Sequence, residues 1–137
     1  MWQVRPAEVA DMAAVEVLVA AVGGDLEDLR AEQFVVAAED RSILGCGRLR
    51  PYPDCWELAS LAVAAEAQAR GIGGSVVNSL LEPHQGPIYL VCEDQEVVFF
   101  SRFGFRVIPT SHIPAGMRSK WQRYRAQAMP LNLMLRE

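Results

Sequence analysis

A glycine-rich turn in the middle of the chain is the first stretch whose residue types suggest chemistry. Residues 68–75 read Gln-Ala-Arg-Gly-Ile-Gly-Gly-Ser, and an apolar helical pattern continues from them to Glu82. Glycines leave backbone N–H groups uncrowded, and at the start of a helix those groups and the helix dipole attract anions. The turn therefore predicts phosphate binding. Taken alone, two close glycines favour an ordinary tight turn that only caps a helix.

A single carboxylate stands on the segment before this turn. Residues 55–63 are almost continuously apolar, which is typical of a central strand, and Glu57 is their only charged residue. Burial disfavours the ionised form of a carboxyl group, and a buried carboxylate can serve as a general base. A salt bridge to Arg48 or Arg50 would instead give Glu57 a purely structural role.

The elements that must position these groups alternate between strand and helix patterns. Strand patterns cover residues 2–5, 33–38, 43–50, 55–63, 88–92, 105–108 and 130–136, and helical patterns cover 8–22, 25–30, 72–82, 94–102 and 114–127. Three consecutive hairpin-linked strands exclude a wholly parallel sheet. We therefore expect an α/β (α+β) fold, a mixed sheet with helices on its faces, in one domain over residues 1–137.

Composition narrows the classes of function. A net charge of −4 argues against a nucleic-acid binder, which normally carries a basic patch. No apolar run is long enough to span a membrane, and no secretory signal is visible, so we expect a cytoplasmic protein. The three cysteines, Cys46, Cys55 and Cys92, are isolated and form neither a disulfide framework nor a metal-binding pattern. We therefore expect no metal.

Three motifs in a fixed order resemble the Gcn5-related N-acetyltransferase (GNAT) superfamily. Residues 57–63, Glu-Leu-Ala-Ser-Leu-Ala-Val, are like the family's fourth strand, and Gln68-x-x-Gly71-x-Gly73 matches its acyl-CoA motif. Residues 99–105, Phe-Phe-Ser-Arg-Phe-Gly-Phe, are similar to its helix-to-strand signature. The competing dinucleotide fold has the fingerprint G-x-G-x-x-G, but Val76 stands at the third glycine and hairpins precede the turn.

The resemblance implies a fold, a reaction and a set of site residues. The fold is the GNAT fold, a mixed sheet of six to seven strands with helices on both faces and a splay between strands 4 and 5. The reaction is direct transfer of an acetyl group from acetyl-CoA, the cosubstrate, to a primary amine, with Glu57 as the catalytic base. The residues implied in acetyl-CoA binding are Leu61, Ala62, Val63, Gln68, Arg70, Gly71, Ile72, Gly73, Gly74 and Ser75.

The chain departs from the family pattern where the leaving thiolate is usually protonated. Phe100 occupies the position of the family's tyrosine, and a phenyl ring has no proton to donate. Ser101, Tyr89 or water could replace it, or the thiolate could leave unprotonated, which its modest pKa permits. Glu93 replaces an asparagine that often contacts CoA.

The acceptor amine is open between two groups of substrates. The Phe-Phe-x-x-x-Gly-Phe variant, Ile113-Pro114 and the basic tail 118–125 are similar to the acetyltransferase domain of N-acetylglutamate synthases. This favours an amino acid whose carboxylate pairs with Arg48, Arg50 or a tail arginine, although a solvated face is the commoner explanation for any one arginine.

An acidic run favours a cationic acceptor instead. Four carboxylates in this run, Asp25, Glu27, Asp28 and Glu32, would favour a polyamine, an aminoglycoside or a lysine-bearing peptide, or simply form a charged surface. Two alternatives to a small-molecule enzyme also stand, a protein or peptide N-acetyltransferase and a non-catalytic CoA-binding regulatory module. The apolar segment 131–135 could pair across a homodimer.

Overall fold

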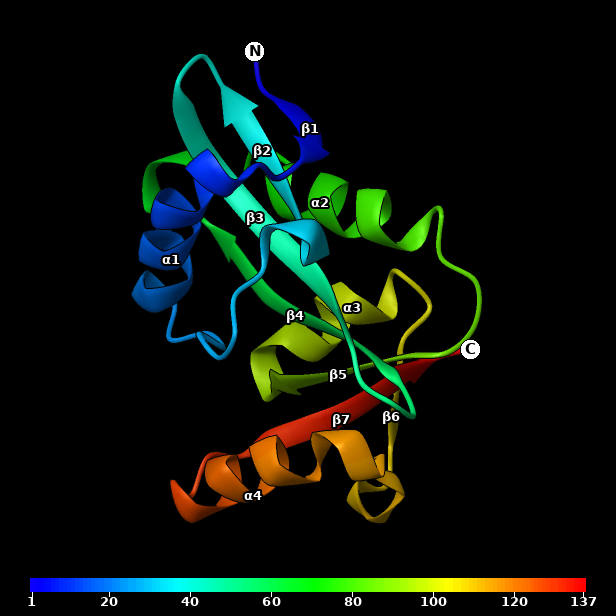
Figure 1. Ribbon diagram of the computed structural model, residues 1–137. Coiled ribbons are helices and arrows are strands. Elements are labelled where there is room, and N and C mark those ends of the chain that lie inside the picture. Colours follow the sequence, from blue (N-terminus) through cyan, green and yellow to red (C-terminus); the bar gives the residue numbers. More distant parts are fainter. The chain divides into compact units, whose positions relative to one another are not determined.

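The computed structural model describes residues 1–137 as a seven-stranded sheet with four α-helices (Figure 1). The strand order is β1-β2-β3-β4-β5-β7-β6. The strands are β1 (Gln3–Pro6), β2 (Phe34–Glu39), β3 (Ser42–Pro51), β4 (Trp56–Val63), β5 (Ile88–Glu93), β6 (Arg106–Ile108) and β7 (Leu131–Arg136), and the helices are α1 (Met12–Ala21), α2 (Ile72–Leu81), α3 (Val97–Ser101) and α4 (Arg118–Ala126). The chain divides into two compact units, residues 1–49 with 58–84 and residues 50–57 with 85–137.

The sheet is mixed, as the sequence predicted. β4 and β5 run parallel with Glu57 opposite Tyr89, whereas β1–β2, β2–β3, β5–β7 and β6–β7 are antiparallel. The expected splay of β4 from β5 stays a prediction. None of the helices combines the length and the apolar character that crossing a membrane requires.

In the first unit, the alternation of β3 side chains places α1 and α2 on opposite faces of the sheet. Cys46 packs into a core with Val15 and Val19 of α1. Its neighbour Gly45 faces α2, and a Cβ atom at Gly45 would lie 2.6 Å from Cγ2 of Ile72. Glycine at this position therefore lets the start of α2 lie directly against the strand.

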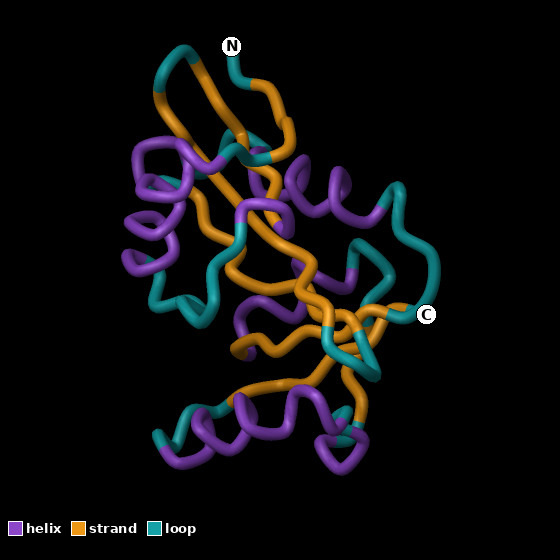
Figure 2. Tube along the Cα trace, viewed as in Figure 1, coloured by secondary structure: helices purple, strands orange, loops and turns teal.

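The segment between α1 and β2 is a correction to the sequence-based expectation. The helical pattern at 25–30 predicted a short helix, but these residues form a loop with one turn, which Figure 2 shows between α1 and β2. The Asp25 carboxylate accepts a hydrogen bond from the Glu27 N–H at 2.9 Å, and Asp28 has φ +47°. Short polar side chains that bond to nearby backbone groups favour turns over helices.

In the second unit, β7 is the strand on which the rest is assembled. It pairs with β5 at six positions and with β6 at three, and α4 packs Trp121 into the core that Leu133 and Leu135 form. At residues 133–135, both sides of β7 are thus occupied by strands of the same chain. The expectation of a homodimer stays a prediction.

Candidate active site

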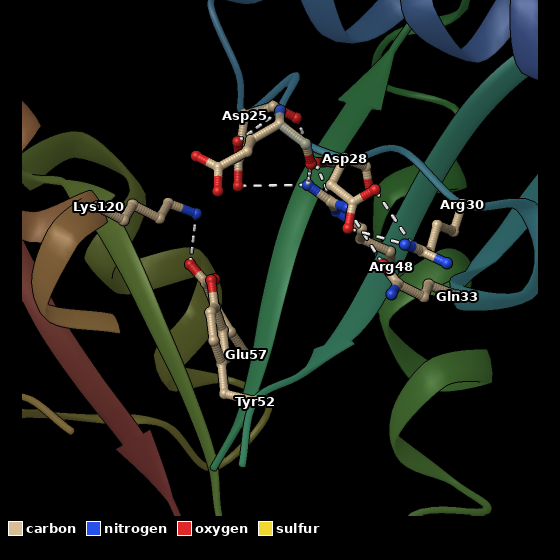
Figure 3. Close-up of polar contacts among 10 residues, drawn as sticks. Asp25, Asp28, Arg30, Gln33, Arg48, Tyr52, Glu57 and Lys120 are labelled. Atoms are coloured by element: carbon tan, nitrogen blue, oxygen red, sulfur yellow. Dashed lines mark hydrogen bonds and ion pairs between the residues drawn. The ribbon is translucent and has the colours of Figure 1, made fainter. Parts of the chain in front are cut away.

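The residue expected to act as the base, Glu57, lies in a buried polar cluster of the second unit. Glu57 is 1% exposed. The Tyr52 hydroxyl donates a hydrogen bond to Oε1 at 2.8 Å, and Lys120 Nζ of α4 donates to Oε2 at 2.5 Å (Figure 3). The Lys120 side chain is 7% exposed and its Nζ lies 5.8 Å from the ring centroid of Tyr124. Both carboxylate oxygens are therefore engaged, one of them by an ion pair.

A turn bound to the start of α4 brings Lys120 to Glu57. Tyr52 N–H donates to the Cys55 carbonyl at 2.8 Å and closes the turn between β3 and β4. Asp54 in this turn accepts the Gly116 N–H at 3.1 Å, one residue before Met117, the N-cap residue of α4. A Cβ atom at Gly116 would lie 2.5 Å from the Asp54 carboxylate, so only glycine fits there. The turn thus fixes the start of α4 in a position from which Lys120 contacts Glu57.

Sequence reasoning missed Lys120. The partners it considered for Glu57 were Arg48 and Arg50, whereas the ion pair joins residues 57 and 120. One signal was available: Lys120 is the only lysine among thirteen basic residues, in a tail otherwise rich in arginine. A lone lysine is a compact point charge suited to one carboxylate oxygen, where arginine would offer a planar fork.

A second buried polar cluster, which we call the Arg48 cluster, joins β3, β4 and loop 25–33 of the first unit (Figure 3). Arg48 is fully buried, so the expectation of a solvated face is wrong for it. Its guanidinium donates to Ser60 Oγ (3.1 Å), the Asp28 carbonyl (3.0 Å), Gln33 Oε1 (3.1 Å) and the Glu27 carbonyl (2.9 Å), and pairs with the Asp25 carboxylate (3.3 Å). These partners match the five N–H donors of arginine.

The other groups considered for acceptor binding have different environments. The Arg50 guanidinium lies 5.0 Å from the Tyr52 ring centroid. Arg118, Arg123 and Arg125 are exposed along α4. In the acidic run, the Asp28 carboxylate pairs with Arg30 at 3.1 Å, and the Asp25 carboxylate pairs with Arg48. Part of that negative charge is therefore already neutralised.

The glycine turn forms the start of α2 in the first unit. Gly71 is the N-cap residue with φ +81°, and Ser75 N–H makes a helical bond to the Gly71 carbonyl at 3.1 Å. The N–H groups of Ile72, Gly73 and Gly74 precede that bond, and first-turn N–H groups have no partner within their helix. The Gln68 side-chain amide donates to the Val63 carbonyl at 3.5 Å, which joins the turn to the end of β4.

Arg70, the charged residue of the turn, pairs with a carboxylate of β2. Arg70 Nη2 lies 3.1 Å from Glu39 Oε2, and the Arg70 side chain is 42% exposed. The hydrogen bond from Arg70, followed by the bond from the chain's N-terminal amine, lowers the pKa of Glu39. An anion that bound Arg70 would compete with Glu39.

The region expected to supply an acid is an aromatic core. Phe100 is buried and its ring packs edge-on against Phe99 and Phe105, with centroids 5.0 and 6.1 Å away. The Ser101 hydroxyl donates to the Val97 carbonyl at 2.7 Å within the helix. Neither residue therefore presents a proton, since one has none and the other's is bonded to its own helix.

The cysteines and other metal-binding residue types form no further site. Burial is the main cause that raises the pKa of the Cys46, Cys55 and Cys92 thiols to about 12. No group of three or more His, Cys, Asp or Glu side chains is arranged to hold a metal ion.

Comparison with known proteins identifies the family. A family model described as an acetyltransferase (GNAT) domain matches residues 30–107, more than half of the chain. The chain therefore belongs to the GNAT family of acetyltransferases, in agreement with the strand, glycine and Gly-Phe motifs of its sequence. We find no match among curated proteins.

Solved structures with the same fold include CoA complexes. N-acetylglutamate synthase from Neisseria gonorrhoeae, complexed with coenzyme A and N-acetyl-glutamate, aligns with TM-score 0.80 and 20% identity over 99% of this chain. The alignment covers only 35% of the synthase chain. Rv2747 from Mycobacterium tuberculosis, in complex with CoA and NLQ, has TM-score 0.78, 22% identity and 98% coverage of both chains. Escherichia coli ElaA has TM-score 0.72 and 18% identity over 100% of this chain and 99% of its own.

Proposed function

We propose that this acetyltransferase moves the acetyl group of acetyl-CoA directly to the primary amine of a small molecule, and that an amino acid is the preferred acceptor. The amine attacks the thioester carbon, the carbon–sulfur bond breaks, CoA leaves as a thiolate, and a base takes the proton of the attacking nitrogen. Acetyl-CoA as cosubstrate is supported by the CoA complexes of the gonococcal synthase and Rv2747.

The observation that carries the proposal is the ammonium group bound to Glu57. Lys120 Nζ, a primary amine, lies 2.5 Å from the buried carboxylate. The acceptor has the same chemical group, so Glu57 Oε2 suits an acceptor nitrogen that replaces Lys120 or reaches the carboxylate through water. Tyr52 and Lys120 each hold one oxygen of this carboxylate, so the group that would accept the proton is oriented by two neighbours.

The glycine turn is assigned to the phosphates of acetyl-CoA. The turn of residues 70–75 would bind the pyrophosphate through the N–H groups of Ile72, Gly73 and Gly74, which precede the first helical hydrogen bond. Leu61–Val63 would offer backbone groups to the pantetheine arm. Arg70 would exchange Glu39 for a phosphate. With Phe100 in the aromatic core and the Ser101 hydroxyl bonded to Val97, the thiolate would leave unprotonated or take its proton from Tyr89 or water.

Two observations support an amino acid as the acceptor: the ligand of a structural neighbour, and the ion pairs that occupy carboxylates of the acidic run. The gonococcal synthase structure contains N-acetyl-glutamate, the product of such a transfer. Asp25 is occupied by Arg48 and Asp28 by Arg30, which weakens the case for a polycationic acceptor. Since Arg48 is buried among its own partners, an acceptor carboxylate would pair with an exposed arginine of α4.

An acceptor screen tests the proposal. Acetyl-CoA is incubated at several pH values with amino acids, spermidine and a lysine-bearing peptide, with free thiol and acetylated product both measured. We expect product from an amino acid, and a Glu57→Gln turnover reduced by about 100-fold or more with unchanged acetyl-CoA affinity. Glu16→Gln, an exposed carboxylate of α1, is the matched control and should behave as the wild type.

Two outcomes would refute parts of the proposal. Unaltered turnover in a folded Glu57→Gln variant would remove Glu57 as the base. Acetyl-CoA binding without product from any acceptor would favour the regulatory-module alternative.

A further inference from the structure

Ser60 has a backbone conformation that strands rarely contain. It lies inside β4 with φ +55°, in the left-handed region that disfavours residues with a Cβ atom. Residues 57–60 are buried one after another, and only from Leu61 do buried and half-buried residues alternate. A left-handed residue interrupts the two-residue period of a strand, so Ser60 changes the direction in which the following residues present their backbone groups.

The Arg48 cluster holds Ser60 in this conformation. Ser60 Oγ accepts the Arg48 Nε–H at 3.1 Å and donates to the Asp25 carbonyl at 2.7 Å. The Ser60 carbonyl accepts a hydrogen bond from Cys46 Sγ at 3.6 Å. A disfavoured conformation persists only where its surroundings determine it, and here three neighbours bind the side chain and the carbonyl of one residue.

The Arg48 cluster connects the loop to strand β4 through all the donor groups of one arginine. The guanidinium of Arg48 binds two carbonyls of loop 25–33, and Asp25 is 9% exposed. An arginine with all its donors engaged has no capacity left for an external carboxylate. Its role is therefore to fix the loop and β4 to each other.

We infer that Arg48 is a positioning residue for the cosubstrate: through Ser60 it sets the path of β4, so that Leu61–Val63 present their backbone groups to the pantetheine arm of acetyl-CoA. This inference rests on the proposed function, since it takes from it the assignment of Leu61–Val63 to pantetheine and of residues 70–75 to the pyrophosphate. The inference adds to the proposed function one residue, Arg48, which touches no ligand itself and acts through strand β4.

Two ligands separate this role from a general loss of structure. Acetyl-CoA contains the pantetheine arm, whereas adenosine 3′-phosphate 5′-diphosphate retains the phosphates but lacks that arm. Calorimetric titration of Arg48→Lys, which keeps the charge but not the planar fork, should show acetyl-CoA affinity reduced by about tenfold, the effect of one or two lost hydrogen bonds. Affinity for adenosine 3′-phosphate 5′-diphosphate, which lacks the pantetheine arm, should stay unchanged.

A second variant and a control complete the experiment. Ser60→Gly adopts φ +55° without strain but loses both Oγ hydrogen bonds, so it should fold and show the same selective loss. Arg30→Lys makes the same chemical change on the same loop, in an exposed pair with Asp28, and should leave both affinities unchanged.

The outcomes distinguish the two ideas. Wild-type protein that binds neither ligand would refute the proposed function, and this inference with it. Wild-type protein that binds both, with variants that lose neither ligand or lose both equally, would overturn the role of Arg48 and leave the proposed function intact.

Discussion

Removal of Lys120 should destabilise the protein strongly, because it leaves the Glu57 carboxylate buried without its counter-charge. Glu57 is 1% exposed and its ion pair with Lys120 is 2.5 Å long. Breaking a buried pair from one side typically costs about 3–5 kcal/mol. We expect that loss in the free energy of unfolding of Lys120→Met at pH 7, where methionine preserves much of the side-chain volume.

The expected shift of the melting temperature follows from chain length. An unfolding entropy of about 2.1 cal/mol/K per residue over 137 residues makes 1 kcal/mol equivalent to roughly 3–4 °C. The midpoint of Lys120→Met should therefore fall by roughly 10–17 °C. Urea titration and thermal unfolding followed by circular dichroism measure both quantities. Arg118→Met removes a positive charge from an exposed position of the same helix, and should change stability by no more than about 0.5 kcal/mol.

A double variant gives the sharpest test because it predicts a reversal of sign. Glu57→Gln in the Lys120→Met background replaces an uncompensated charge by a neutral amide, so the double variant should be more stable than Lys120→Met alone. The coupling energy of the two positions should be about 2–3 kcal/mol. A Lys120→Met loss below about 1 kcal/mol, or a double variant less stable than the single one, would refute the reasoning.

Three further predictions concern thiols, pH and salt. The three thiols, Cys46, Cys55 and Cys92, each have a pKa raised to about 12. At pH 7.5 they should therefore react with a thiol reagent at least about tenfold more slowly in the native than in the unfolded protein. The hydrogen bond from Arg5 lowers the pKa of Asp11 below 3.8. The ionised Asp11 therefore stabilises the folded protein above pH 4, and this contribution is lost as the pH falls through the lowered pKa. Urea titrations should show the stability difference between wild type and Asp11→Asn narrowing from pH 6 to pH 2.5. Glu39→Gln releases Arg70, so calorimetry should show slightly tighter acetyl-CoA binding at low salt and no gain at high salt.

The parts of the fold that could be predicted from the sequence depend on local patterns. Alternating or continuous runs of apolar residues located all seven strands within two residues, and the glycines of residues 71–74 located the start of α2. These signals work because side-chain period and turn chemistry are properties of neighbouring residues. The family followed from the same local motifs, and the match over residues 30–107 confirms it.

What could not be predicted depends on contacts between distant residues. Residues 25–30 carry a charge pattern compatible with a helix, but Arg48, about twenty residues away, binds the carbonyls of Glu27 and Asp28 and holds them as a loop. The same distance effect misled the interpretation of Arg48. A charged residue in a strand is usually solvated, and only the tertiary structure supplies the acceptors that allow its burial.

Lys120 changes what the burial of Glu57 means for catalysis. From the sequence, burial alone was the reason to consider Glu57 a base, since an apolar strand disfavours the charged carboxylate. In the structure the carboxylate is buried together with an ammonium group 63 residues further along the chain. Both of its oxygens are bonded, so the proposed use of Glu57 as a base requires the displacement of Lys120 or Tyr52 from one of them. If the proposed acceptor brings its own ammonium group to Glu57, it replaces one charge pair by another, and the acceptor screen should then show a lower KM for a charged amine than for a neutral amine of the same size.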